Sequence, residues 1–237
     1  MKYLATVLSV IFALATAVLC GFVAWRESGL WVIAVCVAMV LSLPASSLLH
    51  ELGHMLFGAI CKIKAVPKFS LFGSSCCNLI PKTDKKLRVR LFFTALGGVL
   101  VNLAVVIIIS FVVRYTTAPA WLTFIVPSNV YLLILNIIPA WFNSGKTDGL
   151  VCNDMLNNTD NAKVLLAVLT VQAQVLGGKP IEEVDEKLLF DLPQIQEDDP
   201  AFISLAELRY EYFKAKGEEE NTEIWQTRFE ELKKEYL

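Results

Sequence analysis

The sequence predicts an all-α polytopic membrane protein with four transmembrane helices and a small C-terminal cytosolic helical domain. The chain of 237 residues is 55% hydrophobic and only 19% charged, which is too apolar for an ordinary soluble domain. Charge is also unevenly distributed: residues 1–150 carry 12 basic and 4 acidic residues, whereas residues 151–237 carry 9 and 19. We expect no nucleic-acid partner, because the basic residues lie beside apolar segments and the polar part is acidic.

Four apolar segments predict helices that cross the lipid bilayer. A helix of about 20 residues crosses a hydrocarbon core of about 30 Å. We predict transmembrane helices at about residues 3–25, 30–60, 91–113 and 118–142, within a domain of residues 1–150. The loop between the second and third helices holds eight basic residues against the single acid Asp84. The positive-inside rule therefore predicts a multi-pass protein of the cell membrane with this loop and both termini in the cytoplasm.

Residues 151–237 are predicted to form an acidic cytosolic domain of amphipathic helices. The candidate helices are residues 162–176, 182–190, 200–216 and 219–236, with helix stops at Gly177-Gly178 and Gly217. Paired helices of this length resemble tetratricopeptide hairpins, but no repeat period of about 34 residues is present to establish a repeat. We expect the domain to regulate or to bind a protein partner rather than to catalyse, because it contains no histidine.

The second predicted helix carries a motif with metal chemistry, His50-Glu51-Leu52-Gly53-His54. The two histidines lie one helical turn apart on the same face, so both imidazoles can reach one metal ion. Glu51 can then take a proton from a water on that metal. The alternative is a pair of satisfied interface histidines, but ionisable residues within an apolar helix are rare and usually functional.

A catalytic zinc site needs a third protein ligand, and the chain has no third histidine. The other acids of residues 1–150 are Glu27, Asp84 and Asp148. The predicted topology puts Glu27 at the opposite membrane face. Asp84 lies among lysines, so ordinary charge pairing with them explains its presence without a metal. Asp148 remains, although Asp148-Gly149 taken alone is better interpreted as an ordinary turn.

Three motifs together resemble the site-2 protease family of intramembrane zinc metalloproteases, in its bacterial type. They are the HELGH sequence at residues 50–54, the Asn-x-x-Pro sequence at residues 136–139, and Asp148-Gly149 after the fourth span. Asn102, which follows Gly97-Gly98 in the third span, is similar to the small-residue-then-Asn segment of that family. The resemblance covers about residues 30–150. Small residues at these positions allow helices to approach closely in lipid.

The resemblance implies a three-helix metalloprotease core with one Zn2+ ion and Glu51 as general base. The implied metal ligands are His50, His54 and Asp148. Asn136 and Asn102 are candidates for orienting the substrate backbone or stabilising the oxyanion, but amides that bridge helices explain them equally well. Residues 66–73 alternate in a way that suits β-augmentation of a substrate. A plain interfacial loop whose lysines meet anionic lipid explains that segment better.

The sequence therefore predicts an intramembrane zinc endopeptidase. Its expected substrates are membrane-spanning or membrane-retained proteins and peptides, which it would hydrolyse in the lipid bilayer. The alternative is a catalytically idle membrane protein of the same fold that serves as a metal- or partner-binding module. A transporter also fits four spans, but transport does not require the glutamate of the HExxH motif.

The topology can be tested by labelling single cysteines from outside the cell. In a chain whose native cysteines are replaced, a probe at Ser28→Cys or Thr117→Cys should react, because both positions lie in outer connections. A probe at Thr83→Cys should be protected, since it lies in the basic loop. Labelling of position 83 from outside would invert the predicted topology.

Overall fold

The computed structural model of the chain is predominantly helical. It describes residues 2–26, 30–68, 76–117, 122, 125–142 and 145–236. The chain divides into two compact units. The first contains Met1–Ile60, Ala65–Asn78 and Phe93–Asn153, and the second contains Cys61–Lys64, Leu79–Phe92 and Asp154–Leu237.

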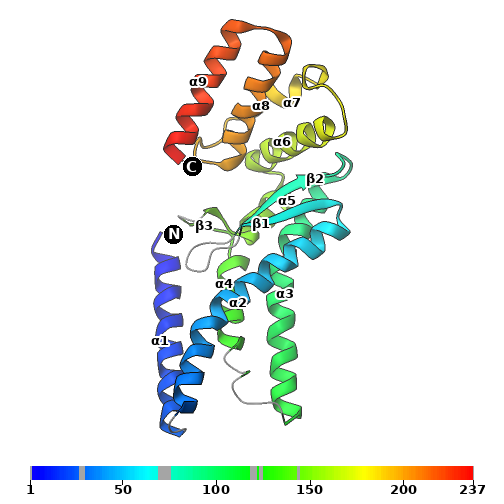
Figure 1. Ribbon diagram of the computed structural model, residues 1–237. Coiled ribbons are helices and arrows are strands. Elements are labelled where there is room, and N and C mark those ends of the chain that lie inside the picture. The colour runs from blue at the N-terminus through cyan, green and yellow to red at the C-terminus, as the bar shows by residue number, and fades with distance from the viewer. Residues whose placement is uncertain are drawn as a thin grey trace. The chain divides into compact units, whose positions relative to one another are not determined.

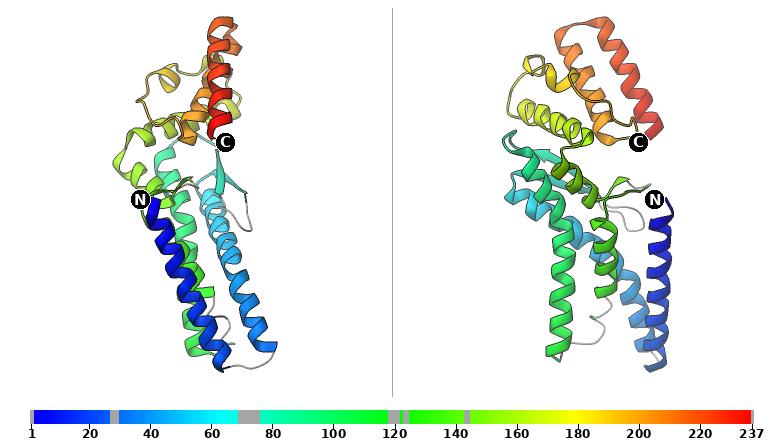
Figure 2. Two further views of the ribbon diagram at one scale, coloured as in Figure 1. Left: turned by 90° about the vertical axis from the view of Figure 1, so that its left-hand side faces the viewer. Right: turned by 180° about the vertical axis from the view of Figure 1, so that it is seen from behind.

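Helices occupy all four apolar segments of the first 150 residues. They are α1 (Lys2–Arg26), α2 (Leu30–Ile60), α3 (Leu87–Tyr115) and α4 (Ile125–Ile137). Figures 1 and 2 show these helices lengthwise beside one another, with α2 inclined to the others. In the described part of the chain, α3 is the one helix long and apolar enough to cross a membrane, and Val7–Leu19 and Ile125–Ile137 are shorter apolar helical stretches.

The fourth apolar segment is less regular than the single helix expected over residues 118–142. Helix α4 ends at Ile137, because the residue before a proline disfavours helical backbone and Pro139 follows. The chain then forms β3 (Trp141–Phe142) and β4 (Gly145–Lys146), which pair antiparallel. It enters α5 (Asp148–Asn157) directly afterwards.

The loop between α2 and α3 contains two strands, β1 (Ile63–Lys68) and β2 (Cys76–Pro81), which form a two-stranded sheet. Residues 66–68 of the candidate substrate-binding segment belong to β1, whereas residues 69–73 lie outside the described residues. Ile63 and Ala65 are buried on alternate positions of β1, as expected for a strand with one covered face. The role of this segment in substrate binding stays a prediction.

The C-terminal helices agree closely with the expected ranges. They are α6 (Asp160–Leu176), α8 (Pro200–Lys216) and α9 (Glu219–Tyr236). Residues 182–190 are divided instead between a 3-10 turn, η2 (Ile181–Glu183), and one turn of helix, α7 (Lys187–Phe190). Helix α7 begins with backbone hydrogen bonds from Leu188 to the carbonyl of Asp185 and from Leu189 to that of Glu186, each at 2.9 Å.

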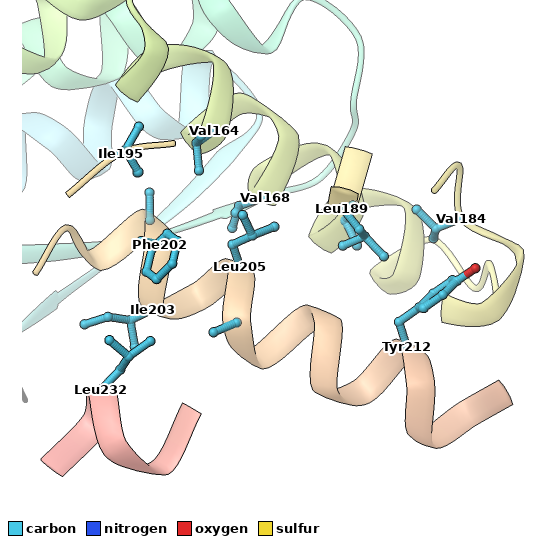
Figure 3. Close-up of a cluster of buried hydrophobic side chains, with 13 residues drawn as sticks. Val164, Val168, Val184, Leu189, Ile195, Phe202, Ile203, Leu205, Tyr212 and Leu232 are labelled. Atoms are coloured by element: carbon cyan, nitrogen blue, oxygen red, sulfur yellow. The ribbon is translucent and has the colours of Figure 1, made fainter. Parts of the chain in front are cut away.

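The second unit has its own apolar core, which Figure 3 shows in close-up. Val168 of α6 lies beside Leu205 of α8, and Leu232 of α9 packs against Ile203 on the same helix. Gly217 joins α8 to α9 in left-handed backbone, with φ of 73°, where a glycine carries no steric penalty. The acidic segment is thus a packed helical domain with a hairpin of two helices at its end.

Candidate metal centre

Helices α2 and α3 approach each other at two glycines. A Cβ added to Gly53 would lie 2.5 Å from the carbonyl oxygen of Gly97, far inside van der Waals contact. The sequence expectation that glycines allow close helix approach is therefore confirmed at this point. The contact brings one face of α3, with Thr94, Gly98 and Asn102 at intervals of four residues, against the histidine face of α2.

The two histidines turn the same ring nitrogen toward a shared point. The Nε2 atoms of His50 and His54 lie 3.1 Å apart, and both residues are buried. The Nδ1 atom of His54 lies 2.8 Å from the backbone carbonyl of Thr94. A carbonyl can only accept, so Nδ1 carries the proton and Nε2 of the neutral ring keeps its lone pair. Nδ1 of His50 lies 2.5 Å from Oδ1 of Asn102. This nitrogen therefore also carries the ring proton, and Nε2 of His50 keeps the lone pair.

Asp148 completes the group from the first turn of α5. Its Oδ2 atom lies 3.0 Å from Nε2 of His50, and its Oδ1 atom lies 3.4 Å from Nε2 of His54. The neighbouring Thr147 hydroxyl donates to the carbonyl of Ile138 at 2.7 Å and fixes the start of the helix. A side chain at Gly149 would collide with the carbonyl of Ile137. Asp148-Gly149 is thus the tightly packed beginning of a helix, whereas the sequence alone favoured a turn.

These three residues fit a bound metal ion. One ligand atom from each of His50, His54 and Asp148 lies within 4.8 Å of the others, which makes this the one such cluster among the described residues. Tetrahedral ligands at about 2.05 Å from zinc lie about 3.3 Å apart, close to the separations observed. Oδ2 of Asp148 is buried, and with the His50 proton on Nδ1 it faces the lone pair of Nε2 without a donor between them. Acceptors that face one another without a donor repel, and a cation at their centre removes the repulsion.

Glu51 lies beside the cluster and has a partner that the sequence did not predict. The side chain is only 4% exposed, which is rare for a glutamate without a function or a counter-charge. The thiol of Cys77 on β2 donates to its Oε2 atom at 2.9 Å. Glu51 therefore enters the site as a buried carboxylate with one oxygen engaged by a weak donor.

The two candidate asparagines occupy different surroundings. Asn102 is fully buried and contacts His50, as described above. Asn136 instead donates from Nδ2 to the carbonyl of Leu132 in its own helix, at 3.1 Å. Their roles in orienting a substrate stay predictions. Of the acids set aside in the sequence, Asp84 contacts Gln174 at 3.5 Å, and Glu27 lies outside the described residues.

Several contacts of the site were missed by sequence reasoning. Thr94 acts through its backbone carbonyl, so its side chain gives no signal. Asn129 of α4, which contacts Asn102 at 2.7 Å, did carry a signal, since an amide within an apolar helix is costly unless it is buried against a hydrogen-bond partner. Cys152 lies one turn after Asp148, but burial and the Asp148 charge raise the pKa of its thiol to about 12.

Comparison with family models, with characterised proteins and with solved structures finds no match to this chain. The likeness to the site-2 protease family therefore rests on the motifs of the sequence. The convergence of His50, His54 and Asp148 is a separate observation, and it shows that the chain has a group able to hold a metal ion.

The contribution of Asp148 can be measured with a charge-removing variant. Asp148→Asn keeps the size of the side chain but leaves two neutral imidazoles to hold the cation. Zinc affinity of the purified chain, measured by competition with a chromogenic chelator, should fall at least about tenfold. Asp84→Asn is the matched control and should bind zinc as the wild type does. The reverse pattern would place the third ligand in the basic loop.

A variant of Gly98 provides a second test, which concerns the space beside the two histidine ligands. A Cβ at this position would lie 2.6 Å from Nε2 of His50 and 2.7 Å from Nε2 of His54. Gly98→Ala should therefore lower zinc affinity at least about tenfold, although alanine favours a helix by about 0.5–1 kcal/mol. Gly21→Ala is the control, since a Cβ on this helical glycine meets nothing within 4 Å. Equal zinc affinity in both variants would show that the ligands do not need the Gly98 gap.

Proposed function

We propose that this chain is an intramembrane zinc-dependent endopeptidase of the site-2 protease type. The observation that supports the proposal best is the convergence of His50, His54 and Asp148 beside a buried Glu51. Two imidazoles and one carboxylate are a common ligand set of catalytic zinc. Three protein ligands leave a fourth position for water or substrate, whereas a structural zinc site is closed by four.

The residues of this chain can perform peptide hydrolysis in two proton transfers. Zinc, when bound, supplies the positive charge that acidifies a water near neutral pH and polarises the scissile carbonyl. As the oxygen of the attacking water bonds to the carbonyl carbon, Glu51 accepts a proton from that water. The same carboxyl then gives the proton to the leaving nitrogen as the C–N bond breaks. The products are a carboxylic acid and an amine, and Glu51 returns to its starting state.

The proposed setting is the lipid bilayer, with α1, α2, α3 and α4 as the spans of a multi-pass protein. The hydropathy of α3 supports this setting. The exposed surface of α1 and α3 supports it too, because it carries large apolar side chains such as Val18, Ile107 and Phe111 that suit lipid better than water. A substrate helix must unwind locally to expose a peptide bond to the site. We infer that the substrates are membrane-spanning or membrane-retained proteins and peptides.

The enzyme and its catalytically idle alternative can be separated with Glu51→Gln. The amide cannot accept a proton, but it removes no metal ligand. We expect zinc content equal to wild type by elemental analysis of the purified chains. We also expect that new protein N-termini, found by mass spectrometry in membranes of cells producing the wild type, disappear in cells producing the variant. Glu207→Gln, the same change at an exposed position, should preserve those termini.

Two outcomes would count against the proposal in different ways. Identical N-termini in the wild type and Glu51→Gln would show that the chain binds metal without cleaving proteins. Loss of zinc in Glu51→Gln would show that Glu51 holds the metal, either directly or through its neighbours, so the loss of cleavage could not be assigned to a general base.

A further inference from the structure

The two histidines are oriented by acceptors of different kinds. His54 donates from Nδ1 to the backbone carbonyl of Thr94, which can act only as an acceptor. His50 faces the side-chain amide of Asn102, and an amide offers either an oxygen or an NH2 group depending on its rotation by about 180°. The tautomer of His54 is therefore fixed by backbone, whereas that of His50 depends on whatever fixes Asn102.

A buried chain of hydrogen bonds fixes the rotation of Asn102. Nδ2 of Asn102 lies 2.7 Å from Oδ1 of Asn129, and Nδ2 of Asn129 lies 2.8 Å from the backbone carbonyl of Ile125. Asn129 also contacts the hydroxyl of Ser46 at 2.7 Å. Ser46, Asn102 and Asn129 are each 0% exposed, so water does not compete for these bonds.

The carbonyl of Ile125 sets the donor-to-acceptor direction of this series of hydrogen bonds. The carbonyl of Ile125 accepts only, so Asn129 must turn its NH2 group toward that carbonyl and its oxygen toward Asn102. Asn102 must then donate to Asn129 and offer its own oxygen to His50. A hydroxyl can donate or accept, so Ser46 does not set the direction. His50 consequently carries its proton on Nδ1 and presents a lone pair at Nε2, the atom that faces Asp148 and His54.

We propose that Asn129 is a positioning residue of the metal centre, which acts through Asn102 to fix the tautomer of His50. The inference rests on the metal-binding part of the proposed function and not on peptide hydrolysis. Asn129 lies in α4, Asn102 in α3 and His50 in α2, so the bonds join three helices around one ligand. Outer-shell partners of this kind typically change metal affinity by about 10–100-fold.

Without Asn129, the Asn102 amide is left with one weaker restraint. Its Nδ2 atom also lies 3.4 Å from the carbonyl of Ser46, which is at the long limit for a hydrogen bond. Rotation of the amide would then turn its NH2 group toward His50. His50 would have to accept at Nδ1 and carry its proton on Nε2, where it blocks the metal.

A double-mutant cycle tests this mechanism in the full chain purified in detergent, with zinc alone as the probe. Asn129→Leu should lower zinc affinity at least about tenfold. Asn102→Ala removes the acceptor that orients His50 and should lower zinc affinity by a similar factor. In the Asn102→Ala background, Asn129→Leu should then change zinc affinity by less than about threefold, because the route from Asn129 to His50 is already lost.

The control is Ser128→Ala, which removes a buried polar contact between α4 and α2 beside the position of Asn129. The Ser128 hydroxyl lies 2.6 Å from that of Ser42 and takes no part in the hydrogen bonds that lead to His50, so zinc affinity should stay at the wild-type value.

Asn129→Ser provides a second variant if leucine prevents folding. A hydroxyl can donate or accept, so it also leaves the rotation of the Asn102 amide unfixed. Equal losses of affinity for Asn129→Leu in both backgrounds would mean a purely structural role and overturn the proposal. Unchanged affinity in folded Asn129→Leu or Asn129→Ser would overturn it as well.

Discussion

The central constraint in this molecule is the mutual repulsion of electron pairs at the ends of three buried side chains. Nε2 of His50, Nε2 of His54 and the Asp148 carboxylate lie 3.0–3.4 Å apart, and when both rings are neutral with the proton on Nδ1 no donor lies between them. A fold gains nothing from gathering acceptors unless a cation joins them. The surrounding architecture makes this arrangement possible: the Gly53–Gly97 contact closes α2 on α3, and the start of α5 delivers the carboxylate.

Backbone groups do much of the orienting in this site. A carbonyl at Thr94 fixes one ring directly, and a carbonyl at Ile125 is the fixed end of the bonds that lead to the other. Backbone carbonyls in helices have known direction and cannot change protonation state, so they are dependable references for a metal site. The longer route to His50 requires two amides that are completely buried, where each unpaired group would cost about 1–3 kcal/mol.

The parts of the site that lie close together in sequence were predictable, and those that depend on packing were not. The spacing of His50 and His54 places both imidazoles on one helical face by geometry alone. Asp148 could be reached only by elimination and by resemblance, since its place at the start of α5 depends on the end of α4. Cys77 comes from a strand whose pairing partner no local pattern defines. Positions of the C-terminal helices were predictable because their glycine stops are local signals, whereas the break before α7 falls at residues 184–186, where no glycine or proline marks it.

The polar residues within the apolar helices follow a common logic. Ser46, Asn102 and Asn129 would each be costly in a helix that faced lipid on all sides. They are instead buried against one another, so their hydrogen bonds replace those that water would offer. Each of these bonds also joins two different helices, which in the proposed membrane setting lack a hydrophobic force that would hold them together. The same contacts that orient His50 therefore contribute to holding α2, α3 and α4 in register, so the integrity of the metal ligands and the packing of the helices depend on a single set of interactions.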